Sequence, residues 1–234
     1  MSALLCAHIM KHILVTLLAL LSTTFGTFGQ IIIADWTFET SQPGATNQTT
    51  FTGINPEIGV GAASGVHASA ATDYSSPAGN GSTHSFSVNT WAIGDYFQFR
   101  VSTLGNTGVQ VGWEQTRSGP GPTNWNFAYS LNGVDFTVAL NSYTVNQITW
   151  STTTVTNASS FSVDLSSVNV LDNASAVYFR VSAASAPGSA AGTARLDDFQ
   201  VTTTPVPEPR EYAAVAALGL LGFAAYRRWS LSRV

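Results

Sequence analysis

Four acidic residues near the two ends of a long β-rich segment are the best candidates for site chemistry. Asp35 and Glu39 stand near its start, and Asp197 and Asp198 near its end. If the strands that carry them pair, their carboxylates meet, and Ca²⁺ takes roughly six to eight oxygen ligands of this kind. We therefore predict a structural calcium site at these four residues, completed by backbone carbonyls. The alternative is that the acids cap strands or face solvent.

A second candidate site is an aromatic residue flanked by amides. Trp125 follows a Gly-Pro-Gly-Pro loop and stands between Asn124 and Asn126. Aromatic faces stack on sugar rings, and amide side chains hydrogen-bond to hydroxyl groups. The pattern predicts a glycan-binding cluster. Burial is the alternative, because a tryptophan in a β-sandwich more often packs in the core.

Catalytic motifs are hard to find in this sequence. The β-rich segment has two histidines, His67 and His84, without the spacing of an HExxH metal motif, and it has no GxSxG nucleophile elbow. Glu57 and Glu114 are candidates for a glycosidase acid pair only by elimination. We predict a non-enzymatic protein with no catalytic residue and no cofactor beyond the calcium ion.

The charge balance excludes several classes of partner. Residues 30–204 carry eleven acidic side chains against four arginines and no lysine. A negatively charged segment is repelled by phosphate backbones and anionic lipids, so nucleic acid is excluded as a partner. The only cysteine, Cys6, precedes this segment, which therefore has no disulfide, no thiolate nucleophile and no cysteine-ligated zinc.

Apolar residues in this segment alternate with polar ones, which is the period of a strand with one buried face. The alternation recurs at residues 97–101, 109–113, 127–131, 136–140, 161–165 and 177–181. Turn residues separate these runs, and Asn132-Gly133 predicts a hairpin because both residues tolerate positive φ. We predict an all-β protein in which residues 30–204 form a single antiparallel β-sandwich, jelly-roll-like in topology.

The first and last strands are expected to pair at the base of the sandwich. They are predicted at residues 31–40 and 194–203. The hydrophobic period of the last strand breaks at Asp197-Asp198, which predicts a β-bulge at that point. This pairing is what would bring the four acidic residues together.

Residues 1–29 have the layout of a secretory signal peptide. A basic residue, Lys11, precedes an apolar run at 13–21, and small and polar residues follow. Gly29 fits the −1 position of a signal-peptidase site, so we predict cleavage after it. An uncleaved N-terminal anchor is the alternative, and both interpretations put the β-rich segment outside the cytoplasm.

Residues 205–234 form a tail of three parts. They are a motif of Val206, Pro207, Glu208 and Pro209, an apolar stretch at 212–226, and a basic end at 227–234 with Arg227, Arg228 and Arg233. As a helix the apolar stretch would measure about 22 Å against the ~30 Å hydrocarbon core, so we predict a short transmembrane helix. The positive-inside rule places the arginines in the cytoplasm. An ordinary C-terminal anchor is the alternative.

The order and spacing of these three parts resemble the PEP-CTERM sorting signal of Gram-negative bacteria that make extracellular polysaccharide. The resemblance implies an exosortase, an integral-membrane cysteine protease, as a partner after export through the secretion machinery and signal peptidase. The β-rich segment resembles a sandwich domain common in PEP-CTERM proteins, at residues 33–39 and 129–136. Its terminal Leu-Asp-Asp-Phe resembles the last strand of carbohydrate-binding-module jelly rolls, whose acids often hold calcium.

Two functional hypotheses follow. The first is an exported, non-enzymatic envelope or extracellular-matrix protein, anchored in the inner membrane before processing, sorted and cleaved by an exosortase, and associated with exopolysaccharide. The second is a carbohydrate-binding module that holds the matrix glycan, with a structural calcium ion.

The sorting hypothesis predicts that Glu208 is read by the processing enzyme. It is the only charged group in a stretch whose backbone is fixed by prolines on both sides, so shape and charge are recognised together. Glu208→Ala should leave export intact but trap the full-length, membrane-bound form, as immunoblotting of cell fractions would show. Leu218→Ala, which only trims an apolar stretch, is the control. Maturation of Glu208→Ala at the wild-type rate, in a host with an active exosortase, would refute sorting.

Overall fold

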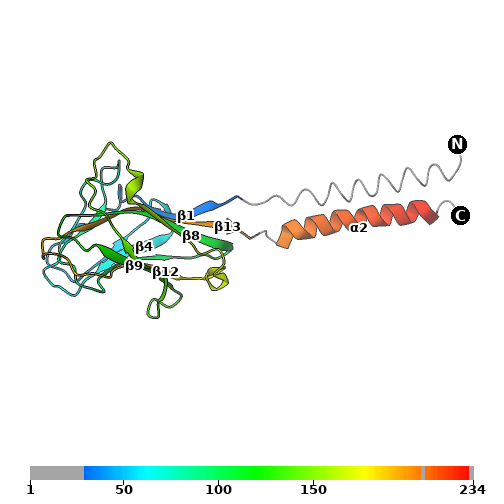
Figure 1. Cartoon of the computed structure of the whole chain (residues 1–234). Coiled ribbons are helices and arrows are strands. Elements are labelled where there is room, and N and C mark those ends of the chain that lie inside the picture. The colour runs from blue at the N-terminus through cyan, green and yellow to red at the C-terminus, as the bar shows by residue number, and fades with distance from the viewer. Residues whose placement is uncertain (1–28, 207–208, 232–234) are drawn as a thin grey trace. The chain divides into compact units, whose positions relative to one another are not determined.

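The computed structural model describes residues 29–206 and 209–231. Gln30–Pro205 form one compact unit, and the C-terminal residues belong to a second unit that is described separately. Within the first unit two antiparallel sheets pack face to face (Figure 1). The prediction of an all-β protein with an antiparallel β-sandwich is therefore confirmed.

The first sheet has seven strands and is built around β13. Its main path runs in the order β11-β8-β13-β1-β3, while β6 pairs with β13 and with β5. The strands are β1 (Ile31–Trp36), β3 (Ile58–Gly59), β5 (Tyr74–Ser75), β6 (Phe86–Val88), β8 (Asn106–Arg117), β11 (Ser160–Asp164) and β13 (Ala194–Pro205).

The second sheet has six strands in the order β10-β9-β12-β7-β4-β2. The strands are β2 (Thr50–Ile54), β4 (Gly61–Val66), β7 (Tyr96–Val101), β9 (Asn124–Ser130), β10 (Thr137–Thr144) and β12 (Val177–Ala183). Two short 3₁₀ turns, η1 (Asn157–Ser159) and η2 (Asn169–Leu171), lie in the connections before and after β11.

Aromatic rings from the two sheets meet in the core. Phe199 of β13 stacks on Phe99 of β7 with ring centroids 3.6 Å apart. Trp113 of β8 stacks on Phe127 of β9 at 4.8 Å. All four side chains are buried, because alternate residues of each strand point inward. These contacts hold the sheets together, since large aromatic side chains contribute much of the apolar area that folding buries.

Strands β1 and β13 pair as predicted, with Asp35 opposite Gln200. The predicted bulge is confirmed too, because the register of β13 against β8 shifts between Asp197 and Gln200. The bulge keeps Phe199 facing the core although two residues separate it from the buried Leu196.

The predicted hairpin around Asn132-Gly133 is confirmed by the antiparallel pairing of β9 with β10. Its connection is longer than a two-residue turn. The Oγ of Ser130 accepts from the backbone N–H groups of Asn132 and Gly133, and Gly133 has φ of 73°. The residue-type signal therefore identifies the turn but not its length.

The C-terminal unit contains helix α2 (Pro209–Leu231), which includes the predicted apolar stretch. Arg227 and Arg228 lie exposed near its end. No helix within residues 29–206 and 209–231 is both long and apolar enough to cross a membrane. Pro207, Glu208 and Arg233 lie outside the described residues, as does the predicted signal peptide except for its last residue.

The stacked pair that joins the sheets predicts a large stability loss on truncation. Phe199→Ala removes a fully buried ring and should lower the free energy of unfolding by roughly 3–5 kcal/mol, measured by urea denaturation. Val138→Ala on β10 is the control, because Val138 is 52% exposed and should change stability by less than about 0.5 kcal/mol. Equal effects of the two substitutions would contradict this account of the core.

Candidate functional site

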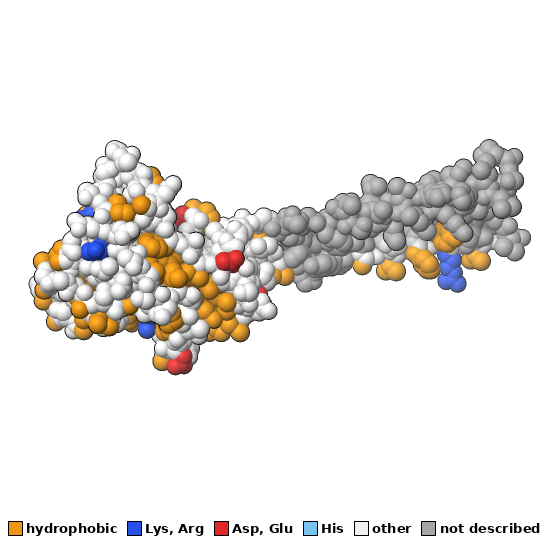
Figure 2. Space-filling view, viewed as in Figure 1, with side chains coloured by type: hydrophobic (Ala, Val, Ile, Leu, Met, Phe, Trp, Pro, Cys, Tyr) orange, Lys and Arg blue, Asp and Glu red, His pale blue; other side chains and the backbone are white. Residues whose placement is uncertain are grey.

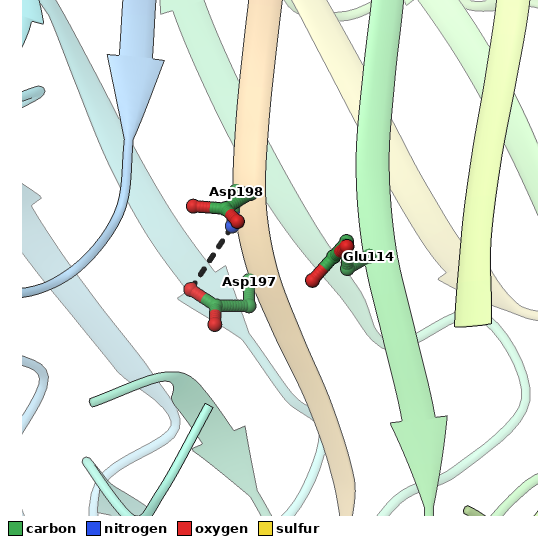
Figure 3. A group of neighbouring side chains, drawn as sticks. All are labelled: Glu114, Asp197 and Asp198. Carbon is green, nitrogen blue, oxygen red and sulfur yellow. Dashed lines mark hydrogen bonds between the residues drawn. The ribbon is translucent and has the colours of Figure 1, made fainter. Parts of the chain in front are cut away.

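An acidic cluster lies on the seven-stranded sheet where β13 bulges. Asp197 stands opposite Glu114 of β8 in the strand register. Carboxylate oxygens of Glu114, Asp197 and Asp198 lie within 4.8 Å of one another. Figure 3 shows the two aspartates on β13 beside the glutamate of the neighbouring strand.

Asp197 is fully buried and held by hydrogen bonds. Its Oδ2 accepts from the backbone N–H of Asn80 at 2.9 Å and from the Oγ of Ser82 at 2.6 Å. Its Oδ1 accepts from the backbone N–H of Asp198 at 3.0 Å. Burial nevertheless raises the pKa of Asp197 to about 7, because it disfavours the charged form more than these donors favour it. A nearby cation would restore the anionic form.

Asp198 sits in the left-handed region with φ of 45°, a conformation that aspartate tolerates better than most residues. Burial raises its pKa to about 6, and the negative charge of Glu114 is the next cause. Asp35, Glu39 and Glu57 add smaller contributions of the same sign. The bulge therefore concentrates negative charge at one place on the sheet.

Two carboxylate oxygens in this region lack a donor. Glu114 Oε2 and Asp35 Oδ1 are buried without a hydrogen-bond partner among the described residues. Burial raises the pKa of both groups. Buried acceptors normally have a partner, and a proton, an ordered water or a cation would each satisfy these oxygens. Of the three carboxylates of the cluster, Glu114 thus has a buried oxygen without a donor, and Ca²⁺ takes oxygen ligands of this kind.

The other two predicted calcium ligands are placed differently. Asp35 lies on β1, and its Oδ2 accepts from Nε2 of Gln200 at 3.3 Å. Glu39 uses its Oε1 to accept from the backbone N–H of His84 at 2.8 Å. Neither belongs to the group of three carboxylates, so their effect on it is electrostatic.

The sequence reasoning missed Glu114 as a member of the cluster. Its position follows from the register of β8 against β13, where Glu114 faces Asp197. Only the alternation of residues 109–113 gave a hint, because it places residue 114 on the outward face of that strand.

The prediction of Trp125 as a sugar-stacking platform is wrong. Its side chain is fully buried, and its Nε1 donates to the carbonyl of Pro122 at 3.0 Å. Its ring packs edge-on against Trp91 at 4.8 Å and lies parallel to Phe97 at 6.3 Å. A ring in the core has no free face for a ligand.

The side chains of Asn124 and Asn126, which flank Trp125 on β9, contact residues of the neighbouring strand β10. The Oδ1 of Asn126 accepts from the backbone N–H of Ser142 at 2.7 Å. The Oδ1 of Asn124 lies 3.4 Å from the Oγ1 of Thr144. Both amides are half-buried, so they do not form the predicted cluster with Trp125.

The outer face of the six-stranded sheet carries a fixed aromatic and polar group instead. The guanidinium of Arg180 lies 3.9 Å from the ring centroid of Tyr96 and 3.8 Å from that of Phe136. Its Nε donates to Oε1 of Gln98 at 2.8 Å, and its Nη2 donates to the carbonyl of Gly133 at 3.2 Å. Tyr96 and Gln98 point outward because the residues between and beside them in β7 face the core.

Neighbouring strands extend this surface. Ser182 of β12 pairs with Tyr96 on one side and with Asn126 of β9 on the other. Tyr178 of β12 also lies half-exposed on this face. We call the whole group the Arg180 face, and its members are Tyr96, Gln98, Asn126, Tyr178, Arg180 and Ser182. It offers ring faces, amides and hydroxyls but no carboxylate.

No family model matches this chain, and no curated protein matches it. Similar solved structures include the CBM22-1–GH10 modules of Clostridium thermocellum endo-1,4-β-D-xylanase 10B with xylohexaose, at 12% identity over 76% of this chain and 29% of that chain, with a TM-score of 0.43. The K1 cleaved adhesin domain of Lys-gingipain from Porphyromonas gingivalis W83 has 14% identity. The match covers 76% of this chain and 99% of the adhesin domain, with a TM-score of 0.39. Such values assign neither a family nor a ligand to this chain.

The acidic cluster predicts opposite effects of protons and calcium. Because the pKa values of Asp197 and Asp198 are raised from 3.8 to about 7 and about 6, the folded protein binds protons more tightly than the unfolded chain. These two groups should therefore make metal-free protein more stable as the pH falls through that window, while buried His67, whose pKa is lowered from 6.5 to about 4, contributes in the opposite direction. Calcium competes with these protons, so its stabilisation should be largest above pH 7 and smallest near pH 5.5.

Melting temperatures in calcium and in EDTA across this pH range provide the measurement. At a hundredfold excess over the dissociation constant, linkage gives about 2.7 kcal/mol, or roughly 5–10 °C for a unit of this size. Asp198→Asn should abolish the calcium effect, while Asp135→Asn in the exposed β9–β10 connection should keep it. Identical melting curves in calcium and EDTA at every pH would show that the cluster binds no calcium.

Proposed function

We propose that this protein is an exported, non-enzymatic β-sandwich that binds a neutral glycan through the Arg180 face. The observation that carries the proposal is the fixing of Arg180 between two aromatic rings on an accessible sheet surface. A flat sheet face with oriented rings and planar polar groups is suited to an extended chain of sugar rings. The proposal develops the second of the two hypotheses drawn from the sequence.

The chemistry of the face matches that of a sugar. A pyranose presents C–H groups on its flat faces, which pack on aromatic rings, and hydroxyls at its edges, which both donate and accept. Gln98 and Asn126 offer amide donors and acceptors, and the hydroxyls of Tyr96, Tyr178 and Ser182 can do either. Across the strands, Tyr96 therefore lies beside Ser182 and Asn126 in one row, and Gln98 beside Arg180 in the next, with neighbouring strands ~4.8 Å apart.

The face is also organised before a ligand arrives. Arg180 is held by two hydrogen bonds and two rings, so little side-chain entropy is lost when it contacts a hydroxyl. Burial lowers the pKa of this arginine, although arginine in proteins stays protonated. A donor that is already held in place contributes more to the affinity for a sugar than a flexible donor, because less entropy is lost on binding.

The low charge of the surface favours a neutral ligand. In the view of Figure 2, uncharged polar and apolar side chains cover most of the described body, and charged groups are scattered singly. Arg180 is already engaged by Gln98 and by two rings, and one further cation, Arg100 of β7, stands opposite Tyr178 at the edge of this face. A strongly anionic polymer would need more positive charge at this face.

We propose that the acidic cluster holds a structural calcium ion on the opposite sheet. Glu114, Asp197 and Asp198 would supply its carboxylate ligands, and the ion would neutralise charge that burial makes costly. Its role would be to stabilise the bulge of β13, since no part of the Arg180 face contacts this cluster.

The cellular setting of the proposal comes from the sequence of the termini. We propose that a signal peptide directs export and that the tail with Glu208 is processed by an exosortase at the membrane. The glycan would then be the exopolysaccharide of the envelope or extracellular matrix. Arg227, Arg228 and Arg233 support a cytoplasmic position for the C-terminus before processing.

Affinity electrophoresis in gels that contain neutral polysaccharides would test the face. Tyr96→Ala removes a ring from the Arg180 face and should weaken binding roughly 3- to 10-fold, because a ring contact contributes about 0.5–1.5 kcal/mol. Gln98→Ala should also weaken it, since the variant loses an amide and loosens Arg180.

The matched control is Gln110→Ala, the same chemical change on β8 of the other sheet, and it should bind as the wild type does. If wild-type protein shows no retardation by any neutral polysaccharide, or if Tyr96→Ala and Gln110→Ala are retarded equally, the proposal fails. The protein would then be a structural component of the matrix.

A further inference from the structure

A separate polar pocket lies in the seven-stranded sheet, where β8 ends and β13 begins. It has a volume of about 170 Å³, and Arg117 and Arg195 both line it. Gln147, Thr149 and Trp150 form other parts of its wall. None of its lining residues is acidic, although the body of the protein carries far more acids than arginines.

The two arginines bond only to neutral groups. Arg117 donates from Nε to the carbonyl of Val145 at 2.9 Å, and from Nη1 to the carbonyls of Ser118 and Gly119 at 3.1 and 2.8 Å. Ser118 and Gly119 line the pocket, so these bonds place the guanidinium at its wall. Among residues 29–206 and 209–231, Arg117 forms no ion pair with a carboxylate.

Arg195 also bonds to a neutral group. Its Nη1 donates to the carbonyl of Ala78 at 3.3 Å, and burial lowers its pKa with no acidic group among the causes. Half-buried guanidinium groups are normally paired, because desolvation of an unpaired charge is costly. Two such groups beside one cavity therefore form a site that lacks its counter-charge.

We propose that this pocket binds the carboxylate of an acidic sugar residue, a uronate. The planar fork of an arginine matches the two oxygens of a carboxylate. Gln147 and Thr149 add amide and hydroxyl groups for the sugar hydroxyls, and Trp150, whose Nε1 donates to the Oγ of Ser159, gives a rigid wall. The volume is below the ~300–1,000 Å³ of pockets for drug-sized ligands, so one sugar residue is the fitting occupant.

The pocket is independent of the Arg180 face because the two sites share no residue and belong to different sheets. If the protein binds no neutral glycan, the proposal for the pocket still stands. If the pocket binds no uronate, the proposal for the Arg180 face still stands. If both bind, the protein recognises a polysaccharide with neutral and acidic residues at two separate points.

Chemical-shift titration of the full-length protein with D-glucuronate tests the pocket. Methyl β-D-glucoside tests whether the carboxylate is needed, and sodium sulfate tests for binding of a bare oxyanion. We expect shifts of the amides of residues 116–119, 147–150 and 193–195 with glucuronate, much weaker ones with the glucoside, and weakening of the affinity by added sodium chloride.

Arg195→Gln should weaken glucuronate binding about tenfold or more, since a charge-assisted hydrogen bond is lost. Arg195→Lys keeps the charge but not the fork, and it should restore only part of the affinity. Arg100→Gln removes the same charge outside the pocket, from an exposed position on β7 opposite Tyr178, and is the matched control for shifts at the amides of the pocket. The side chain of Arg195 makes one hydrogen bond to the rest of the chain, so these variants should fold, as their melting curves would show.

Three results would overturn the proposal. The first is the absence of shifts at the pocket with glucuronate. The second is equal loss of affinity in Arg195→Gln and Arg100→Gln, which would indicate only a general charge effect. The third is binding of sulfate as tightly as glucuronate at the same amides, which would make the pocket a simple oxyanion site with no preference for a sugar.

Discussion

The bulge in β13 is the constraint on which the rest of the structure depends. β13 pairs with β1, β6 and β8, and its Phe199 stacks on Phe99 of the opposite sheet. In a regular strand the same sequence would turn Phe199 outward, because it stands three residues after the inward-facing Leu196 and successive side chains alternate between the two faces. The bulge keeps the ring in the core, and the consequence is that two adjacent aspartates occupy one place on the sheet beside Glu114.

This constraint explains why the acidic cluster is electrostatically costly. The aspartates occupy the positions that the bulge provides, and burial raises the pKa of both. Their charge is relieved by a proton at low pH or, on our proposal, by a cation at higher pH. The other sheet has no such irregularity in β7 and β12, which pair in continuous register. Its regular outer surface can therefore present the Arg180 face as a flat array.

The sequence was sufficient to predict the sandwich, because alternation of apolar and polar residues directly reports which face of a strand is buried. It also located the bulge, since a break in that period has few other causes. It could not identify Glu114 as a neighbour of Asp197, because strand register depends on contacts between residues far apart in the chain. Trp125 shows a different limit: flanking amides suggested exposure, but the ring packs against Trp91, and no local pattern distinguishes those outcomes. The Arg180 face could not be predicted from the sequence either, because Arg180 of β12 contacts Phe136 only when β12, β9 and β10 have paired.

The central claim is that the outer face of the six-stranded sheet binds a neutral sugar chain. The most direct measurement is a map of backbone amide shifts in the full-length protein with a neutral oligosaccharide. The account predicts that the shifted amides gather on β7, β9 and β12 around Arg180, with the residues of β8 and β13 unaffected. Shifts confined to the seven-stranded sheet, or none at saturating oligosaccharide, would contradict it.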